Sequence, residues 1–341
     1  MSIFDIFRPR PQTPAILGAL PDLRTQEERA GDVHISEIVA RSAALELKTL
    51  EPGQVRTFGD QNQGGKSDCV AETRRKVKRV MLKVNKGLDL DFSATAFYRR
   101  RANYPAPGMQ WADAVAIDKE FGMTLDALVP SDAVRDEATA NALRPELYNA
   151  DIGKVFAIDE EVSFDPGDFE TPAGTIQVSR KAVMAWFFFN YQEWARQVPV
   201  VLDPRLQWAG AATLRHSVSL IEPAIFQGQR GFWIDDSAQF GGFARRFVTE
   251  EFYRARNWVA SYPIAFKFEK GVGARPRYTG TTTSAQECLR YEGLFPTNVD
   301  YVDVVGPLTR RALGGLQARY GLKQTQALDA ATDALLRRAY P

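Results

Sequence analysis

Gln63-Gly64-Gly65-Lys66-Ser67-Asp68-Cys69-Val70-Ala71-Glu72-Thr73 is the stretch on which the organisation of this chain depends, because a glycine turn meets the start of a helix there. After Cys69, apolar side chains recur at three- and four-residue spacing, which predicts one buried helical face. They are Val70, Val77, Val80, Met81 and Val84. The helix should begin at Cys69, with Asp68 as its N-cap. Because the first turn of a helix stabilises a thiolate, this position favours a reactive sulfur; a small buried cysteine that only fills space is the other interpretation.

A second segment of chemical interest is centred on His216. The chain has two histidines, His34 and His216, and we assign no role to His34. The alternating run His-Ser-Val-Ser-Leu-Ile from residue 216 predicts a strand. After a turn at 227–231, the run Phe-Trp-Ile-Asp-Asp-Ser at 232–237 predicts its hairpin partner. A histidine that merely occupies a strand, beside two aspartates that end a hairpin, would explain the same residues.

Together these segments resemble the papain family of cysteine peptidases. Gln63 precedes Cys69 by six residues, and His216 lies 147 residues beyond Cys69, an order and spacing found in that family. The resemblance implies that Cys69 is the nucleophile, that His216 is the general base and that Asp236 orients His216. It also implies that Gln63 and the Cys69 N–H bind the oxyanion. The family usually carries asparagine where Asp236 stands, so Asp236→Asn is expected to keep the orientation and the activity near neutral pH.

The match to the family is incomplete at four places. Ser67 stands where a glycine is usual, and Asp68 stands where a serine is usual. No tryptophan follows Cys69, and Ala238 replaces the tryptophan that covers the catalytic residues in the family. The missing covering tryptophan and the aspartate in place of asparagine at position 236 keep open a papain-like protein with weak or no activity.

The expected fold is α+β, with a helical first half, a half of antiparallel strands and a cleft between them. The resemblance implies Trp111 and Gly65 as substrate-binding residues, although core packing explains Trp111 equally well. The patterns predict helices over 112–121 and 179–197, and strands over 155–158, 175–178 and 199–202. The basic residues of the Cys69 helix are expected on a solvated outer face, or alternatively on a surface for an anionic polymer. They are Arg74, Arg75, Lys76, Lys78, Arg79, Lys83 and Lys86.

Four regions are expected along the chain: an N-terminal arm over 1–45, the peptidase domain over 46–272, a linker over 273–283 and a small helical unit over 284–341. The last unit resembles the peptidoglycan-binding-like domain family through Gly306-Pro307-Leu308-Thr309 and the residues that follow. This resemblance implies peptidoglycan as a partner and a three-helix fold. Asp303 stands where the family has its first glycine, and a purely structural bundle is the other interpretation.

Composition limits the classes of function. The formal net charge of +1 argues against a general nucleic-acid binder. No stretch has the length of a membrane span, and residues 1–7 lack the pattern of a secretory signal. We therefore expect a protein made in the cytoplasm without a signal peptide. We also expect it to be associated with a virion or to act at the cell wall. Two cysteines, Cys69 and Cys288, do not make a disulfide framework, and no metal or cofactor is expected.

The sequence thus predicts a thiol-dependent hydrolase of peptide bonds, with a protein or a wall peptide crosslink as substrate. The alternative is a catalytically weak or inactive papain-like protein with a structural or binding role in a phage particle or an envelope assembly. Reactivity of Cys69 near neutral pH distinguishes the two.

Overall fold

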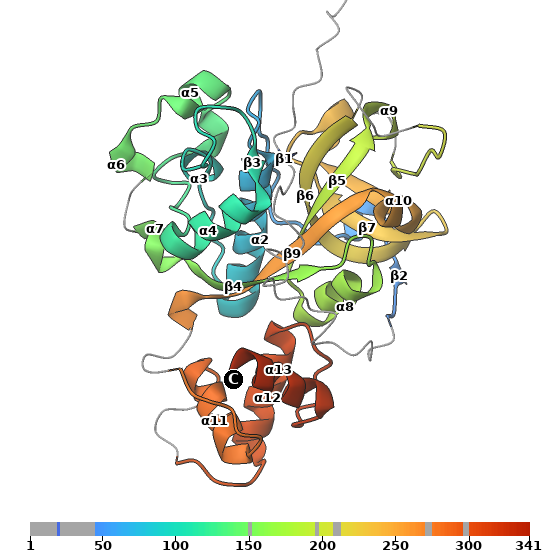
Figure 1. The fold of residues 1–341 in the computed structure, drawn as a ribbon. Helices are drawn as coiled ribbons and strands as arrows, with labels where there is room; N and C mark the ends of the chain where they lie inside the picture. The colour runs from blue at the N-terminus through green and yellow to red at the C-terminus, as the bar shows by residue number, and fades with distance from the viewer. Residues whose placement is uncertain are drawn as a thin grey trace, which may run out of the picture.

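The computed structural model describes residues 19–20, 45–148, 152–194, 198–206, 213–269, 275–295 and 300–341. A helical half and a sheet half lie side by side, and the C-terminal helices lie beneath them (Figure 1). Of the expected N-terminal arm, the described part before residue 45 is a two-residue strand, β1 (Ala19–Leu20). His34 lies outside the described residues.

The helical half is built around α2 (Cys69–Lys86), which begins at the predicted residue. Four of the five residues of the predicted apolar face are buried, whereas Val84, near the end of the helix, is 39% exposed. The helix ends at Gly87 in the left-handed conformation, which glycine adopts without steric cost. The other elements of this half are η3 (Pro52–Gln54), α3 (Ala94–Tyr98), β3 (Met109–Gln110), α4 (Trp111–Phe121), η4 (Ser131–Ala133), α5 (Glu137–Asn141), α6 (Pro145–Tyr148) and α7 (Ile152–Val155).

The sheet half contains one sheet whose strands pair in the order β4-β9-β5-β6-β7-β8, with β2 added in parallel to β6. The other pairs are antiparallel. The predicted hairpin is present as β6 and β7, joined by the turn at Gln227 and Gly228. The strands are β2 (Lys48–Thr49), β4 (Ile158–Phe164), β5 (Val183–Asn190), β6 (Thr213–Phe226), β7 (Gln229–Asp235), β8 (Arg245–Thr249) and β9 (Asn257–Phe266).

Short helices cover the outer face of this sheet and link its strands. Apolar side chains on the two faces of the sheet belong to two clusters, one shared with α2 and the other with α8 and α10. This burial of both faces explains the continuous apolar runs in the central strands. The linking helices are α8 (Glu170–Ser179), α9 (Tyr191–Trp194), η6 (Phe240–Gly242), α10 (Glu250–Arg256) and η7 (Lys267–Glu269).

Four secondary-structure predictions are wrong. Two are the strand over 155–158, which lies across the end of α7 and reaches β4 at its last residue, and the strand over 199–202, where an isolated bridge pairs Val200 with Val248.

The other two concern α8 and β5. The predicted strand over 175–178 is the last part of α8, whose buried residues Ala173 and Ile176 have helical spacing. The predicted helix over 179–197 is mainly β5, followed by the short α9. β5 is a central strand buried on both faces, and periodicity alone does not separate such a run from a buried helix.

Four of the seven basic residues of α2 do not lie on the predicted solvated face, whereas Lys83 and Lys86 are exposed. Arg74, Arg75, Lys76 and Lys78 are buried, and each pairs with a carboxylate from another element. Arg74 pairs with Glu161 on β4, and Lys76 pairs with Asp235 on β7 at 2.9 Å. A surface for an anionic polymer on this part of the helix is therefore excluded, because the charges are covered and neutralised.

The C-terminal helices are α11 (Thr282–Tyr291), α12 (Pro307–Arg319) and α13 (Ala330–Ala339). Their apolar residues belong to the same buried cluster as β5, β9 and α8, and the Tyr262 hydroxyl on β9 donates to the Arg319 carbonyl at 3.1 Å. In the predicted linker, the backbone N–H of Tyr278 donates to the Tyr340 carbonyl at 2.8 Å. The three helices thus share a continuous core with the sheet half.

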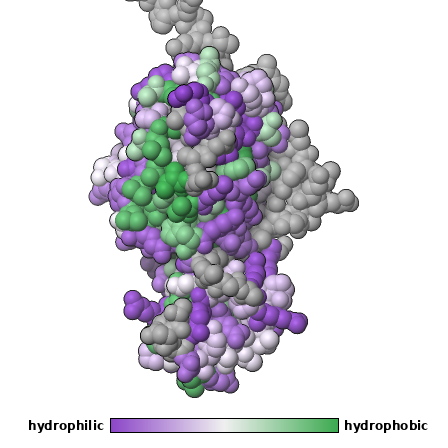
Figure 2. All heavy atoms as spheres, turned by 90° about the vertical axis from the view of Figure 1, so that its left-hand side faces the viewer, coloured by the Kyte–Doolittle hydropathy of each residue, from purple (hydrophilic) through white to green (hydrophobic). Residues whose placement is uncertain are grey.

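Apolar side chains also reach the surface of the helical half, where a green area stands out in Figure 2. Exposed apolar residues of this half include Leu128, Ile152 and Val155. Within the part of the chain that the structure describes, no helix is both long and apolar enough to cross a membrane.

Candidate active site

Cys69 opens α2 and faces the sheet half, and its side chain is fully buried. The backbone N–H of Ser217 on β6 lies close enough to the Cys69 thiol to lower its pKa. The nucleophile predicted on one half therefore lies near the residue that follows the predicted base on the other half. Asp68 occupies the N-cap position as predicted, but its side chain makes no capping hydrogen bond, because it pairs with Lys66 at 3.1 Å.

His216 lies in β6, opposite Phe187 of β5, and the β6–β7 register brings it beside the end of β7. Its Nε2 is 2.7 Å from Oδ1 of Asp236, and both side chains are fully buried. Among the described residues, the other ring nitrogen, Nδ1, has no hydrogen-bond partner. An imidazole held by Nε2 keeps Nδ1 available for proton transfer.

Asp236 is held by four donors. Oδ1 receives His216 Nε2 and the Ala238 N–H at 2.9 Å, and Oδ2 receives Arg246 Nε at 2.8 Å and Trp194 Nε1 at 2.9 Å. Burial alone would raise the pKa of Asp236, but His216, Arg246 and Trp194 outweigh it and lower that pKa to about 2. The carboxylate is thus ionised, and Nε2 of His216 must donate to it.

Two of these partners, Trp194 and Arg246, were missed by the sequence analysis. Trp194 lies in α9, within the segment predicted as a long helix, and its ring meets His216 edge to face at 5.9 Å between centroids. The Phe240 ring meets His216 in the same way at 6.3 Å. The Trp194 and Phe240 rings cover the imidazole, which the small side chain of Ala238, in place of the expected tryptophan, does not do.

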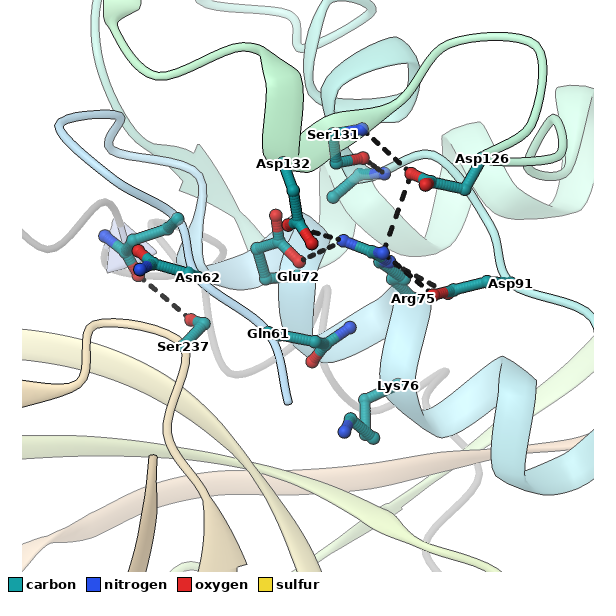
Figure 3. A network of polar contacts seen from close by, with 12 residues as sticks. Gln61, Asn62, Glu72, Arg75, Lys76, Asp91, Asp126, Ser131, Asp132 and Ser237 are labelled. Carbon is teal, nitrogen blue, oxygen red and sulfur yellow. Dashed lines mark hydrogen bonds and ion pairs between the residues drawn. The ribbon is translucent and has the colours of Figure 1, made fainter. Parts of the chain in front are cut away.

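Gln63 lies at the junction of the two halves. Its backbone N–H donates to the Ser237 carbonyl at 3.0 Å, and its Oε1 accepts the Ser237 hydroxyl at 3.0 Å; Figure 3 shows Ser237 reaching across to this loop. Gln63 Nε2 donates to the Lys66 carbonyl at 2.9 Å. These contacts fix which end of the amide carries the N–H groups, because Oε1 accepts a hydroxyl and Nε2 donates to a carbonyl.

The pKa of Cys69 is raised overall, despite its place at the helix N-terminus. Burial of the thiol is the largest effect and raises its pKa well above the ordinary value. The charges of Asp68 and Asp236 raise the pKa further, and the N–H groups of Ser217 and Val70 only partly oppose them. The thiolate predicted from the helix position is therefore disfavoured while the site is closed.

A buried network of charges lies behind Cys69, one turn along α2. Arg75 is surrounded by Glu72 at 3.2 Å, Asp91 at 2.8 Å, Asp126 at 3.6 Å and Asp132 at 3.4 Å (Figure 3). Burial, followed by the nearby charge of Asp68, raises the pKa of Glu72 to about 8. Among the described residues, no group of three or more His, Cys, Asp or Glu side chains has the arrangement of a metal site.

The two predicted substrate-binding residues lie in different surroundings. The Trp111 indole is 5% exposed and donates to the Ser261 hydroxyl on β9 at 2.9 Å. Gly65 is exposed, and its N–H donates to the Arg135 carbonyl at 2.8 Å. Neither residue contacts Cys69 or His216 through a hydrogen bond that the structure shows among its described residues.

β1 lies between the halves. It pairs in parallel with β3, with Ala19 opposite Met109, and also contacts β6 (Figure 1). Ala19 is 3% exposed and belongs to the same apolar cluster as Cys69 and Trp111. A segment far away in the sequence thus occupies the place where the helical wall meets the sheet wall.

No protein-family model and no curated protein matches this sequence, whereas solved structures of cysteine proteases are similar to the fold. Xylellain, a cysteine protease from Xylella fastidiosa, aligns with a TM-score of 0.54 and 14% identity over 72% of this chain and 95% of its own. The proform of the ragweed pollen cysteine protease Amb a 11 aligns with a TM-score of 0.49 and 16% identity over 70% of this chain and 72% of its own. The protease and lectin-like domains of Cwp84 from Clostridium difficile align with a TM-score of 0.49 and 13% identity over 67% of this chain and 56% of their own. The likeness to xylellain shows that the chain has a papain-like fold, in agreement with the predicted α+β architecture.

Proposed function

We propose that the protein is a thiol-dependent hydrolase of peptide bonds, with Cys69 as nucleophile and His216 as base. The observation that carries this proposal is the convergence of three groups from α2, β6 and the end of β7. The Cys69 thiol lies near the backbone N–H that follows His216, and Asp236 holds His216 by Nε2. A nucleophile, a base and an orienting group in this order are what acyl transfer to a thiol requires.

The reaction follows from this geometry. His216 Nδ1 takes the Cys69 thiol proton as the sulfur bonds to the amide carbonyl carbon, and Gln63 Nε2 with the Cys69 N–H stabilises the oxyanion. The C–N bond then breaks as His216 returns the proton to the leaving amine, which leaves a thioester. Water attacks the thioester, gives a proton to His216, and the released sulfur regains it.

The pairing of β1 with β3 supports an extended peptide as the substrate. The β3 backbone pairs with the distant segment β1 as a strand beside the wall that carries Cys69, and backbone pairing is a common mode of peptide recognition. A substrate at this edge has to displace β1, because Ala19 occupies it.

The test is active-site labelling combined with turnover. The native protein is incubated with a thiol-directed peptidyl epoxide and with a panel of fluorogenic peptides, and the modified residue is identified by mass spectrometry. Cys69→Ala should abolish both labelling and turnover, and Cys288→Ala, which removes the other buried thiol, should change neither. Turnover that survives Cys69→Ala would overturn the proposal.

The alternative of a papain-like binding protein is favoured by one observation. Cys69 is fully buried, and its pKa is raised. Such a protein would resist the epoxide under all conditions, including removal of residues 1–44, so the labelling experiment separates the two functions.

Direction to the cell wall is a finer proposal, and it is supported by the sequence pattern of the C-terminal unit. Gly306 is the N-cap of α12 and Pro307 is its first residue, at the positions where the peptidoglycan-binding-like pattern has them. Sedimentation of Cys69→Ala protein with purified sacculi tests this targeting without cleavage of the wall. Recovery entirely in the supernatant would remove peptidoglycan as a partner and would leave the hydrolase proposal unaffected.

A further inference from the structure

Arg246 lies on β8 with a fully buried side chain, and the mechanism above gives it no role. Its Nε donates to Asp236 Oδ2 at 2.8 Å, its Nη1 donates to the Trp194 carbonyl at 2.7 Å, and its Nη2 donates to the Phe240 carbonyl. One guanidinium therefore joins three segments beside the base: the end of β7, α9 and η6.

These contacts determine which way the Asp236 carboxylate faces. A carboxylate held only by His216 could rotate about its last side-chain bond. Arg246 and the Trp194 indole fix Oδ2 from one side, so Oδ1 points at His216 Nε2. The imidazole plane is then set, and Nδ1 is the nitrogen that remains for the thiol.

The charge of Arg246 also bears on the nucleophile. The negative charge of Asp236 is one of the two that raise the pKa of Cys69. A guanidinium in direct contact with that carboxylate opposes its field at the sulfur and keeps it ionised in a buried place. Arg246 thus makes a buried carboxylate compatible with a reaction that passes through a thiolate.

We propose that Arg246 is a positioning residue of this hydrolase, which fixes the Asp236 carboxylate and, through it, the His216 ring in the orientation that proton transfer needs. This inference rests on the proposed function. Arg246 contacts no reacting atom, so its effect should fall on turnover and on the state of His216, not on substrate binding.

The chain offers a matched control one residue away. Arg245 lies on the same strand and pairs with Asp235 at 3.1 Å. Asp235 also pairs with Lys76, not with His216. Arg245→Met removes the same type of side chain from the same kind of ion pair, without touching the group that orients the base.

The kinetic test compares Arg246→Met, Arg246→Lys and Arg245→Met on a peptide cleaved by the wild type. Arg246→Met should lower kcat by about 10- to 100-fold, the range seen when a group that orients a metal-bound histidine is lost, with KM within about twofold. Arg246→Lys should recover part of kcat, because an ammonium keeps the charge beside Asp236 but lacks the planar fork that reaches both carbonyls. Arg245→Met should keep kcat within about twofold. Unchanged kcat in Arg246→Met, or equal losses in Arg246→Met and Arg245→Met, would overturn the inference.

A second measurement does not depend on turnover. In protein labelled with ¹⁵N-histidine, only His34 and His216 contribute, and His34→Gln assigns the signals. Wild type and Arg245→Met should show His216 protonated at Nε2, with a slowly exchanging N–H. Arg246→Met should lose this protected proton. Arg246→Lys should weaken its protection, and it is the variant to use if Arg246→Met does not fold. The same His216 signals in all four proteins would refute the positioning role. An inactive wild type with the expected signals would instead refute the hydrolase and leave the positioning role standing.

Discussion

Asp236→Asn is the substitution for which the structure and the family resemblance give opposite expectations. The family carries an amide at this position, so the resemblance predicts an active enzyme. In this structure both oxygens of Asp236 face donors only: His216 Nε2 and the Ala238 N–H on one side, Arg246 Nε and Trp194 Nε1 on the other. In Asp236→Asn, the side-chain NH₂ group would face two hydrogen-bond donors in either of its two orientations, and it could accept from neither.

The magnitude follows from what remains buried. Arg246 keeps its two carbonyl acceptors but loses its only carboxylate partner among the described residues. Removing one member of a buried ion pair costs about 3–5 kcal/mol, and a buried donor left without an acceptor costs about 1–3 kcal/mol. Because Arg246 retains the carbonyls, we expect the lower part of this range, about 3–4 kcal/mol in the free energy of unfolding. Turnover should fall on the order of 100-fold or more, because the amide cannot orient His216 without displacing another donor.

The assay is urea unfolding, together with kcat on a small peptide, for Asp236→Asn, Asp235→Asn and Asp236→Asn/Arg246→Met. Asp235→Asn breaks the pairs with Lys76 and Arg245, so it should cost stability and leave kcat near that of the wild type. In the double variant no buried cation is left unpaired, so the loss of stability should be smaller than the sum of the single losses by about 1–3 kcal/mol. An Asp236→Asn protein as stable and as active as the wild type would refute this account of the four donors.

Three further outcomes are expected. Because burial raises the pKa of Glu72 to about 8 from an ordinary 4.5, its contribution to stability is full below about pH 4.5 and is lost as the pH rises through 8. Glu72→Gln should therefore flatten the fall in melting temperature between pH 5 and 9 and gain at least about 1 kcal/mol at pH 8; a pH curve parallel to that of the wild type would contradict this. Deleting residues 1–44, which removes β1, should raise the rate of alkylation of Cys69 by iodoacetamide at pH 7, and an unchanged rate would show that β1 does not keep the site closed. Leu316→Ala in α12 should lower the stability of the whole protein by about 2–5 kcal/mol in a single unfolding transition, because Leu316 is buried in the core shared with the sheet half; a separate early transition would instead indicate an independent C-terminal unit.

The sequence analysis identified the residues whose chemistry is local to a motif. The start of α2 at Cys69 follows from the spacing of apolar residues after a glycine turn, and the hairpin that carries His216 follows from alternation around a glycine turn. Both signals lie within a few residues along the chain. The roles proposed for Cys69, His216, Asp236 and Gln63 remain predictions that the kinetic experiments test.

What the sequence analysis missed depends on contacts between distant segments. Trp194 and Arg246 reach Asp236 only because α9 and β8 converge on the end of β7. Arg74 and Lys76 of α2 were predicted on a solvated face, yet carboxylates from β4 and β7 cover and neutralise them. The closed state of Cys69 has the same kind of cause, because the burial that raises its pKa comes from the packing of separate segments. One local signal for Arg246 was the pair Arg245-Arg246, which follows the glycines at 241 and 242. Because neighbouring side chains of a strand point to opposite faces, Arg245 reaches Asp235 and Arg246 reaches Asp236.

The two hydrogen bonds between Gln63 and Ser237 limit the relative motion of the two halves that the site can tolerate. Gln63 carries the proposed oxyanion donor, and Ser237 directly follows the residue that holds the base. A shear of the helical half against the sheet half strains both bonds at once, so the proposed oxyanion donor and the base are displaced from their positions together. Turnover should therefore respond to loosening of the domain interface as a threshold, in contrast to the gradual decline expected when the two walls are adjusted independently.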